Sequence, residues 1–127
     1  MATILLIDDS RLSRSMAAKP LAEAGYAVVE AVDGEGGLRA VEQHQPDCVV
    51  TDLLMPGLDG FHMLEEIRRR GNNVPVIVLT ADIQEGSRAE CERQSVVAFL
   101  NKPIDPVVLR EAVDRALLCT PGSPPCR

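Results

Sequence analysis

Residues 4–10 read Ile-Leu-Leu-Ile-Asp-Asp-Ser, and the pattern that starts here decides the fold. An apolar run this short is typical of a strand that is buried on both faces of a parallel sheet. Two carboxylates follow the run directly, and Ser10 can then cap a helix. The chain therefore begins with a predicted strand and helix that are joined by acidic residues.

Four more short apolar runs recur along the chain, rich in Val, Ile and Leu. They are Tyr26 to Val29, Cys48 to Thr51, Val76 to Leu79, and Val96 to Leu100. Between them, apolar residues recur at the three- and four-residue spacing of a helix. These residues are Leu12 and Met16; Leu38 and Val41; Phe61, Leu64 and Ile67; and Leu109, Val113 and Leu117. The alternation predicts an α/β three-layer sandwich with five parallel strands, five helices and right-handed crossovers.

Local signals agree with these helix boundaries. Gly25 ends the first helix, and Asp105-Pro106 supplies a cap and a first-turn proline for the last. Pro20 removes a backbone donor late in the first helix and should kink its last turn. The fourth helix, Ile83 to Arg93, has few apolar residues to anchor it, which makes it a candidate for motion.

Composition excludes several classes of function. The chain has 127 residues, a net charge of -6 and a pI near 4.8, which argues against a general affinity for nucleic acid or anionic lipid but leaves room for a local basic patch. One Tyr, two Phe and no Trp leave little aromatic surface for base stacking. No apolar run reaches the ~20 residues of a membrane span, and the residues after Met1 are expected to form a strand and not a signal sequence. We expect a cytoplasmic protein.

The four cysteines do not form a metal-binding motif. Cys48, Cys91, Cys119 and Cys126 lack C-x-x-C spacing, and Cys48 is expected in the core. Cys119 and Cys126 flank a Pro-rich stretch that cannot continue a helix, and a functional pair there is the less favoured reading. We expect one domain over residues 1–118 and a flexible tail over residues 119–127.

Chemically active side chains follow four of the five runs. In an open parallel sheet, ligands bind outside the carboxyl ends of the strands. Asp8 and Asp9 follow the first run, Asp52 the third, Thr80 the fourth and Lys102 the fifth. Three carboxylates this close would repel one another unless a hard cation bound between them. Mg²⁺, or Mn²⁺ in its place, suits such oxygen ligands.

The remaining groups suit an incoming phosphoryl group. Lys102 offers a positive charge, Thr80 a hydroxyl donor, and Ala81 a backbone amide. Phosphoryl transfer depends mainly on positioning and charge neutralisation, and the Asp52 carboxylate can act as the nucleophile.

Each of these residues also has a simpler interpretation. Asp8 and Asp9 can cap a helix, and Asp52 can lie in a solvated loop. The Thr80 hydroxyl can form a hydrogen bond with a backbone group, and Lys102 can be a charged surface residue. Their coincidence at the strand ends favours the site. Phe99 can be a core ring and not a functional residue. Arg68-Arg69-Arg70 is best explained by its complementing the negative end of the third helix, and a contact with nucleic acid is the less favoured reading.

Four motifs together resemble the signature of response-regulator receiver domains, over the chain from about Thr3 to Leu118. They are Leu6-Ile7-Asp8-Asp9-Ser10; Thr51-Asp52-Leu53-Leu54-Met55-Pro56-Gly57-Leu58-Asp59-Gly60; Leu79-Thr80-Ala81; and Phe99-Leu100-Asn101-Lys102-Pro103. The resemblance implies a flavodoxin-like sheet with strand order 2-1-3-4-5. It also implies a phosphoacceptor in two-component signalling, not an enzyme with an external substrate.

The resemblance assigns a role to each matching residue. Asp52 is then the phosphoacceptor, Asp9 a direct metal ligand, and Asp8 a ligand through water, with the Leu54 carbonyl as a further ligand. Lys102 pairs with the phosphate, and a cis bond to the following proline aims its amine at the site.

The resemblance also implies a switch and partners. Thr80 and Phe99 form the switch pair, which changes the surface of the fourth helix, fifth strand and fifth helix for a downstream protein. The phosphoryl donor is a histidine kinase or a phosphotransfer protein. We expect a monomer or weak dimer that binds neither nucleic acid nor membrane.

Some residues depart from the family's usual pattern. Leu54 stands where many relatives carry a polar side chain near the hydrolytic water, so we expect the phosphoryl group to persist unless Asp82 compensates. Ser95-Val96 replaces a common Gly-Ala pair, and Gly36-Gly37 weakens the second helix. These departures bear on local geometry and phosphoryl lifetime.

Two rival functions differ in what they require. A haloacid-dehalogenase-type phosphatase also uses a strand-end Asp nucleophile with Mg²⁺. That family has a D-x-D motif, in which the second Asp is the general acid, and here Leu54 stands at that position. A degenerate receiver acts without phosphorylation, but such forms tend to lose an acidic residue or the lysine, and this chain keeps them.

Overall fold

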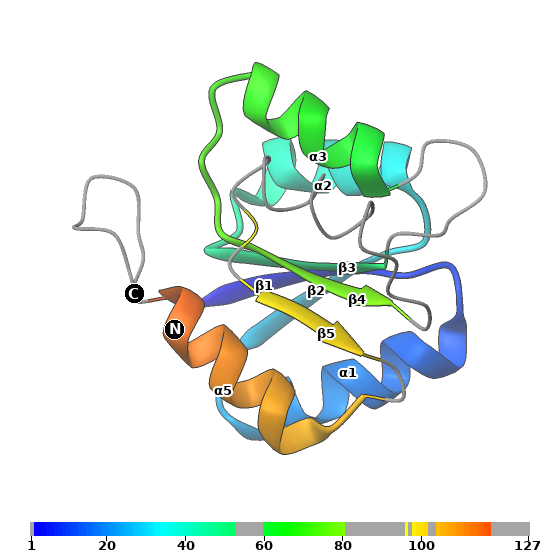
Figure 1. Ribbon diagram of the computed structural model, residues 1–127, viewed down its shortest axis with the longest axis vertical. Coiled ribbons are helices and arrows are strands. Elements are labelled where there is room, and N and C mark those ends of the chain that lie inside the picture. Colours follow the sequence, from blue (N-terminus) through cyan, green and yellow to red (C-terminus); the bar gives the residue numbers. More distant parts are fainter. Residues whose placement is uncertain (1, 53–59, 81–95, 97, 102–103, 118–127) are drawn as a thin grey trace.

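Five parallel strands form the centre of the structure, in the spatial order β2-β1-β3-β4-β5 (Figure 1). The computed structural model describes residues 2–52, 60–80, 96, 98–101 and 104–117. The strands are β1 (Thr3–Ile7), β2 (Ala27–Ala31), β3 (Cys48–Asp52), β4 (Val76–Thr80) and β5 (Ala98–Asn101). This order and direction agree with the α/β, flavodoxin-like expectation.

Four helices in the described part of the chain cover the two faces of the sheet. They are α1 (Arg11–Glu23), α2 (Gly34–His44), α3 (Gly60–Arg69) and α5 (Pro106–Leu117). Figure 1 shows α2 and α3 over one face and α1 and α5 over the other, which gives three layers. The expected fourth helix, residues 83–93, and the expected tail, residues 119–127, lie outside the described residues.

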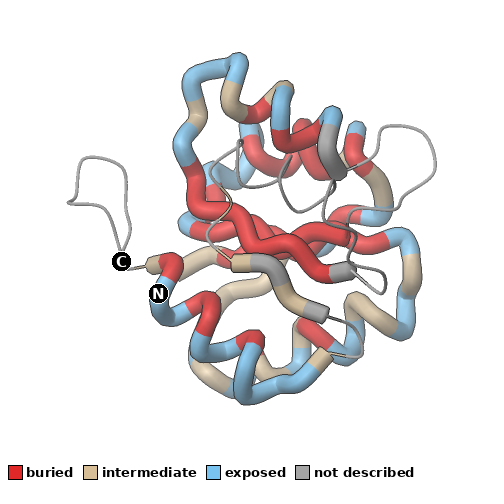
Figure 2. The backbone as a smooth tube through the Cα atoms, in the orientation of Figure 1, coloured by how far each residue is buried: buried red, intermediate tan, exposed pale blue. Residues whose placement is uncertain are grey.

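Alternate residues of each central strand enter different hydrophobic cores, because successive side chains point to opposite faces of a sheet. In β1, Leu5 and Ile7 pack with α2 and α3, whereas Ile4 and Leu6 pack with α1 and α5. All four are fully buried, as Figure 2 shows for the centre of the sheet. Burial on both faces explains why this run is continuously apolar instead of alternating.

The expectation that each apolar run forms a strand buried on both faces is wrong for β2. This strand lies at one edge of the sheet, and its first three residues are only partly buried while Glu30 is exposed. An edge strand has one neighbour, so its apolar run is shielded less completely than that of β3, which is buried throughout. The short run Tyr26 to Val29 does not distinguish an edge from a central position.

The predicted capping residues occupy the ends of α1 and α5. The Ser10 hydroxyl accepts a hydrogen bond from the Ser13 amide at 3.3 Å, and the Asp105 carboxylate accepts one from the Val107 amide at 2.9 Å. Gly25 follows α1 with φ of +95°, the left-handed region that glycine adopts at little cost. These ends were readable from the sequence because capping is local.

The buried face of α1 differs from the apolar spacing in the sequence. Leu12 and Met16 are 70% and 45% exposed, whereas Ala17 and Leu21 are fully buried. The apolar stripe inferred from the first pair is therefore wrong. In α2, α3 and α5, six of the expected residues are buried: Leu38, Val41, Leu64, Ile67, Leu109 and Val113. Leu117 is only partly buried, and the side chain of Phe61 is not among those described.

Two further expectations concern cysteines and membranes. Cys48 is fully buried and unpaired in the core, as expected, and burial raises the pKa of its thiol to about 12. Cys91, Cys119 and Cys126 lie outside the described residues. In the part of the chain that is described, no helix is long and apolar enough to cross a bilayer.

Candidate metal centre

Three carboxylates meet at the carboxyl edge of the sheet. Strands β1 and β3 are neighbours, and their register pairs Ile7 with Thr51, so Asp8 and Asp52 follow at the same edge. Asp9 is the next residue on the first segment. One oxygen from each of the three carboxylates lies within 4.8 Å of the others. The structure thus brings together residues that are more than forty positions apart in sequence.

Two of these carboxylates are buried. Asp8 is 1% exposed and Asp52 is 8% exposed, whereas Asp9 faces solvent. Carboxylates are seldom buried unless they are paired, hydrogen-bonded or bound to a metal. Two of the three carboxylates therefore have little access to water. The third, Asp9, is exposed, and a hydrated ion can approach the cluster from its side.

Backbone groups hold Asp8 in place. Its carboxylate Oδ1 accepts a hydrogen bond from the Ser10 amide at 2.9 Å, and its own amide donates to the Ala31 carbonyl at 3.2 Å. The second bond extends the β1–β2 pairing by one residue beyond Ile7. The strand end and the start of α1 therefore orient this carboxylate together.

The donor set fits a hard divalent cation. Each ligand atom is a carboxylate oxygen, which is the type that Mg²⁺ and Mn²⁺ prefer, and Mg²⁺ is usually held by few protein ligands with waters completing its shell. A cation between the carboxylates would also relieve their mutual repulsion. The position of these oxygens supports a metal site made by Asp8, Asp9 and Asp52.

The other expected site residues are described only in part. Thr80 is the last residue of β4, and the register of β4 with β3 pairs its neighbour Leu79 with Asp52, so the Thr80 backbone lies at the same edge. Phe99 is in β5, beside Val78. The remaining expected residues lie outside the described part of the chain: Leu54, Ala81, Asp82, Lys102 and Pro103.

Two residues beside the cluster were not expected from the sequence. The Arg14 side chain, only 14% exposed, donates from Nη1 to the Asp8 carbonyl oxygen at 2.8 Å. Its Nε pairs with Glu30 Oε1 at 3.2 Å. Glu30 follows the second apolar run, the one run of the five after which no chemically active side chain is expected. Only its position at the end of β2, next to the acidic strand end, could have suggested a role.

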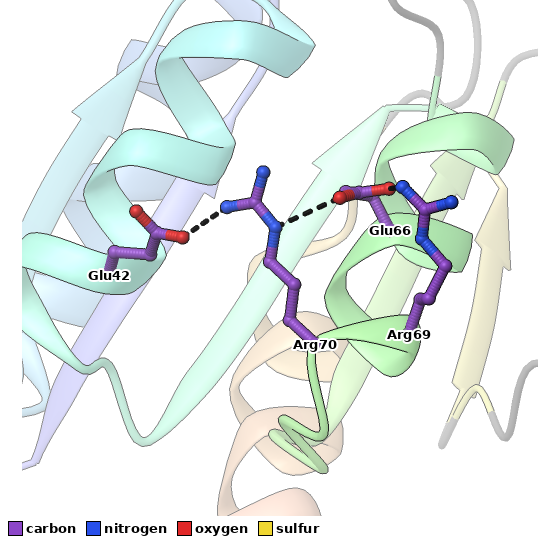
Figure 3. Close-up of polar contacts among 4 residues, drawn as sticks. All are labelled: Glu42, Glu66, Arg69 and Arg70. Carbon is purple, nitrogen blue, oxygen red and sulfur yellow. Dashed lines mark hydrogen bonds and ion pairs between the residues drawn. The ribbon is translucent and has the colours of Figure 1, made fainter.

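The arginine run 68–70 is bound within the protein, and Figure 3 shows the contacts of its last two members. Arg70 contacts Glu66 at 3.0 Å on its own helical face and also Glu42 of α2, while Arg69 pairs with Glu66. The Arg68 Nη1 instead donates to the carbonyl oxygens of residues 72 and 74, at 3.1 and 2.7 Å. The run therefore ties the end of α3 to the next loop and to α2, consistent with a structural role at that helix end.

Comparison with known proteins places the site in a family context. A family model for the response regulator receiver domain matches residues 4–114. The chain is 32% identical over 119 residues to Protein PilH of Pseudomonas aeruginosa, covering 92% of this chain and 98% of that protein. The residues matched by the family model include all three carboxylates and every described strand residue except Thr3.

A longer relative matches over only part of its length. The transcriptional regulatory protein GlrR of Escherichia coli is 36% identical over 116 residues, which is 91% of this chain but 26% of that protein. Among solved structures, the chemotaxis protein CheY4 of Vibrio cholerae superposes with a TM-score of 0.86 at 29% identity. That match covers 91% of this chain and 98% of the other.

Proposed function

This chain belongs to the response regulator receiver domain family, and on that premise we propose that Asp52 accepts the phosphoryl group with a divalent cation held by Asp8, Asp9 and Asp52. Receivers of two-component systems are phosphorylated on an aspartate by histidine kinases and act on downstream effectors. The observation that carries the assignment to Asp52 is the cluster of three carboxylates at the sheet edge.

In the proposed step, a carboxylate oxygen of Asp52 attacks the phosphorus of a phosphohistidine or of a small phosphodonor. The new O–P bond forms as the bond from phosphorus to the leaving group breaks. The leaving atom keeps that electron pair: an imidazole nitrogen is left as the neutral or protonated ring, with any proton coming from water, and acetate leaves as the carboxylate. This step needs no catalytic base, because phosphoryl transfer depends mainly on positioning and charge neutralisation. When bound, Mg²⁺ or Mn²⁺ would neutralise charge on the phosphoryl oxygens.

Four further groups complete the proposed site. The Leu54 carbonyl is proposed as another metal ligand, and Lys102, the Thr80 hydroxyl and the Ala81 amide as partners of the phosphoryl oxygens. The place of Thr80 at the carboxyl end of β4 supports its part. The protein would act on no external substrate and would catalyse only its own phosphorylation and dephosphorylation.

The signal is proposed to leave through the face made by the fourth helix, β5 and α5. Thr80 would move toward the phosphoryl group and Phe99 would follow it inward, which changes this face for a protein partner. Val107 and Val108, at the start of α5, are 64% and 44% exposed, and such exposed apolar side chains suit a partner surface. The donor would be a histidine kinase or a phosphotransfer protein.

Intact-mass measurement with acetyl phosphate tests the phosphoacceptor. The wild-type protein should gain the mass of one phosphoryl group when Mg²⁺ is present and lose that gain when EDTA removes the metal. Asp52→Asn should gain nothing. Asp105→Asn is the matched control, because Asn caps a helix as well as Asp does and this residue caps α5.

Two results would contradict the proposal. Labelling of Asp52→Asn to the wild-type extent would place the acceptor elsewhere. No labelling of the wild-type protein with Mg²⁺ or Mn²⁺ would favour an interaction module that acts without phosphorylation.

A further inference from the structure

We propose that Arg14, held by Glu30, is a positioning residue that sets the geometry of the Asp8–Asp9 pair and thereby the affinity for the divalent cation. This inference rests on the proposed function, since it takes the carboxylate cluster as the metal site. Neither Arg14 nor Glu30 belongs to that cluster, and the proposal concerns how they shape it.

The contact of Arg14 is with the peptide group that joins the two acidic residues. Its Nη1 donates to the Asp8 carbonyl oxygen at 2.8 Å. That carbonyl lies in one rigid plane with the amide and Cα of Asp9, because the peptide bond has partial double-bond character. Fixing the direction of the Asp8 carbonyl therefore also fixes where the Asp9 side chain starts.

The contact is well protected from solvent. The Arg14 side chain is 14% exposed and its hydrogen bond to the Asp8 carbonyl is partly buried, so this hydrogen bond is screened less than one on the open surface. A guanidinium is also planar, with several donors at fixed angles. Arg14 can thus reach Asp8 with one nitrogen while another nitrogen stays on Glu30.

Glu30 supplies the second anchor, from a different strand. Its Oε1 lies 3.2 Å from the Arg14 Nε, and its side chain is 49% exposed. In the β1–β2 register Glu30 lies opposite Leu6, and Leu6 is two residues before Asp8. The chain of contacts runs from β2 through Arg14 in α1 to the loop that carries two of the carboxylates.

Metal sites depend on such supports. Ligand oxygens must be held close to one geometry, and replacing groups that orient the ligands typically weakens metal binding about 10–100-fold. The cluster here draws two of its three carboxylates from this one loop. A change in the loop would therefore alter most of the ligand set at once.

Calorimetric titration with Mg²⁺ tests the proposal directly. Arg14→Gln should weaken Mg²⁺ binding about tenfold. Glu30→Gln and Arg14→Lys should each weaken it less, because each keeps part of the hydrogen-bonded path. Arg69→Gln is the matched control: Arg69 also pairs with a glutamate, but on the exposed face of α3, and its loss should leave the affinity unchanged.

A second readout separates positioning from general damage to the fold. The rate of Asp52 labelling by acetyl phosphate should fall in Arg14→Gln at low Mg²⁺ and return to nearly the wild-type rate at saturating Mg²⁺. A protein that is merely misfolded would not recover in this way. If Arg14→Gln fails to fold, Glu30→Gln decides the question, because its side chain is half exposed.

The outcomes distinguish this inference from the proposed function. If the wild-type protein binds Mg²⁺ and is labelled on Asp52, but Arg14→Gln and Glu30→Gln bind Mg²⁺ with unchanged affinity, the positioning role is wrong and the proposed function stands. If the wild-type protein neither binds Mg²⁺ nor is labelled, both are wrong.

Discussion

Gly37 of α2 packs so closely on Ile7, the last residue of β1, that a Cβ atom on Gly37 would lie 2.6 Å from the Ile7 Cδ1. The same atom would lie 2.9 Å from the sulfur of Met63 in α3. Glycine at this position thus sets how near α2 can approach the strand that delivers Asp8. Its weak helix propensity, noted in the sequence, has a packing reason.

Gly37→Ala should destabilise the protein, although alanine favours a helix by about 1 kcal/mol. Overpacking a buried site costs about 1–3 kcal/mol, so we expect a net loss of about 1 kcal/mol in the free energy of unfolding, measured with urea. Gly36→Ala is the control, because its Cβ would meet only the Asp33 carboxylate at 3.0 Å and Ala31 at 3.8 Å. A Gly37→Ala protein at least as stable as Gly36→Ala would contradict this.

The hydroxyl of Tyr26 should lose its proton at an unusually high pH. Its hydroxyl donates a hydrogen bond to Asp114 of α5, and this bond, with burial, raises the pKa of Tyr26 to about 12. Because the folded pKa lies above the ordinary value of 10.0, this contribution to stability is complete below pH 10 and is lost as the pH rises toward 12. The chain has one Tyr, so the ultraviolet absorbance of its phenolate reports this residue alone.

Replacing the partner should reverse that shift. Asp114→Asn weakens the hydrogen bond that the Tyr26 hydroxyl donates and removes the negative charge that opposes the phenolate, so the pKa of Tyr26 should fall toward 10.0. Glu111→Gln, an exposed change on the same helix, should leave it in place. An identical titration curve for Asp114→Asn and the wild type would refute the assigned cause.

Metal-free protein should be stabilised by the loss of one clustered charge. We expect Asp52→Asn to raise the free energy of unfolding in EDTA by about 1 kcal/mol, because fewer negative charges lie close together. Mg²⁺ at a hundred times its dissociation constant should stabilise the wild type by about 2.7 kcal/mol, and Asp52→Asn much less. Urea denaturation with and without Mg²⁺ measures both effects, and equal stabilisation of the two proteins would argue against Asp52 as a ligand.

Arg68 and Arg70 should differ in how much stability their replacement removes. Arg68 is partly buried, burial lowers its pKa, and it satisfies two backbone carbonyls, so Arg68→Ala should cost about 1–3 kcal/mol. Arg70 is 41% exposed and pairs with Glu42 and Glu66 (Figure 3), so Arg70→Ala should lower the free energy of unfolding by less than Arg68→Ala does. Urea denaturation compares them, and a larger loss for Arg70→Ala would overturn this ranking.

The lifetime of the phosphoryl group should depend on Leu54. A polar side chain there would help to order the hydrolytic water, so Leu54→Asn should speed dephosphorylation several-fold. The decay of labelled protein, followed by intact mass after removal of acetyl phosphate, measures this rate. An unchanged rate would mean that Leu54 does not limit hydrolysis, and Asp82→Ala would then test whether Asp82 orders the water.

Much of the fold was predictable because its signals are local. A central strand of a parallel sheet is a short apolar run, and a helix end carries a capping residue such as Ser10 or Asp105. The positions of Asp8 and Asp52 after their strands were also readable, and parallel strands bring such ends to one edge. Contiguous residues therefore determined the elements and the meeting of the carboxylates.

Only the tertiary structure decided which surfaces and partners these elements use. Leu12 and Met16 have helical spacing, yet α1 buries Ala17 and Leu21, because the face that packs depends on the space left by the sheet and α5. The contact of Arg14 with Glu30 joins residues on a helix and an edge strand, and no local pattern marks it. The spacing of apolar residues along the sequence indicates whether a segment is buried. Which residues pack together or form ion pairs depends on neighbours that the chain brings together only when it folds.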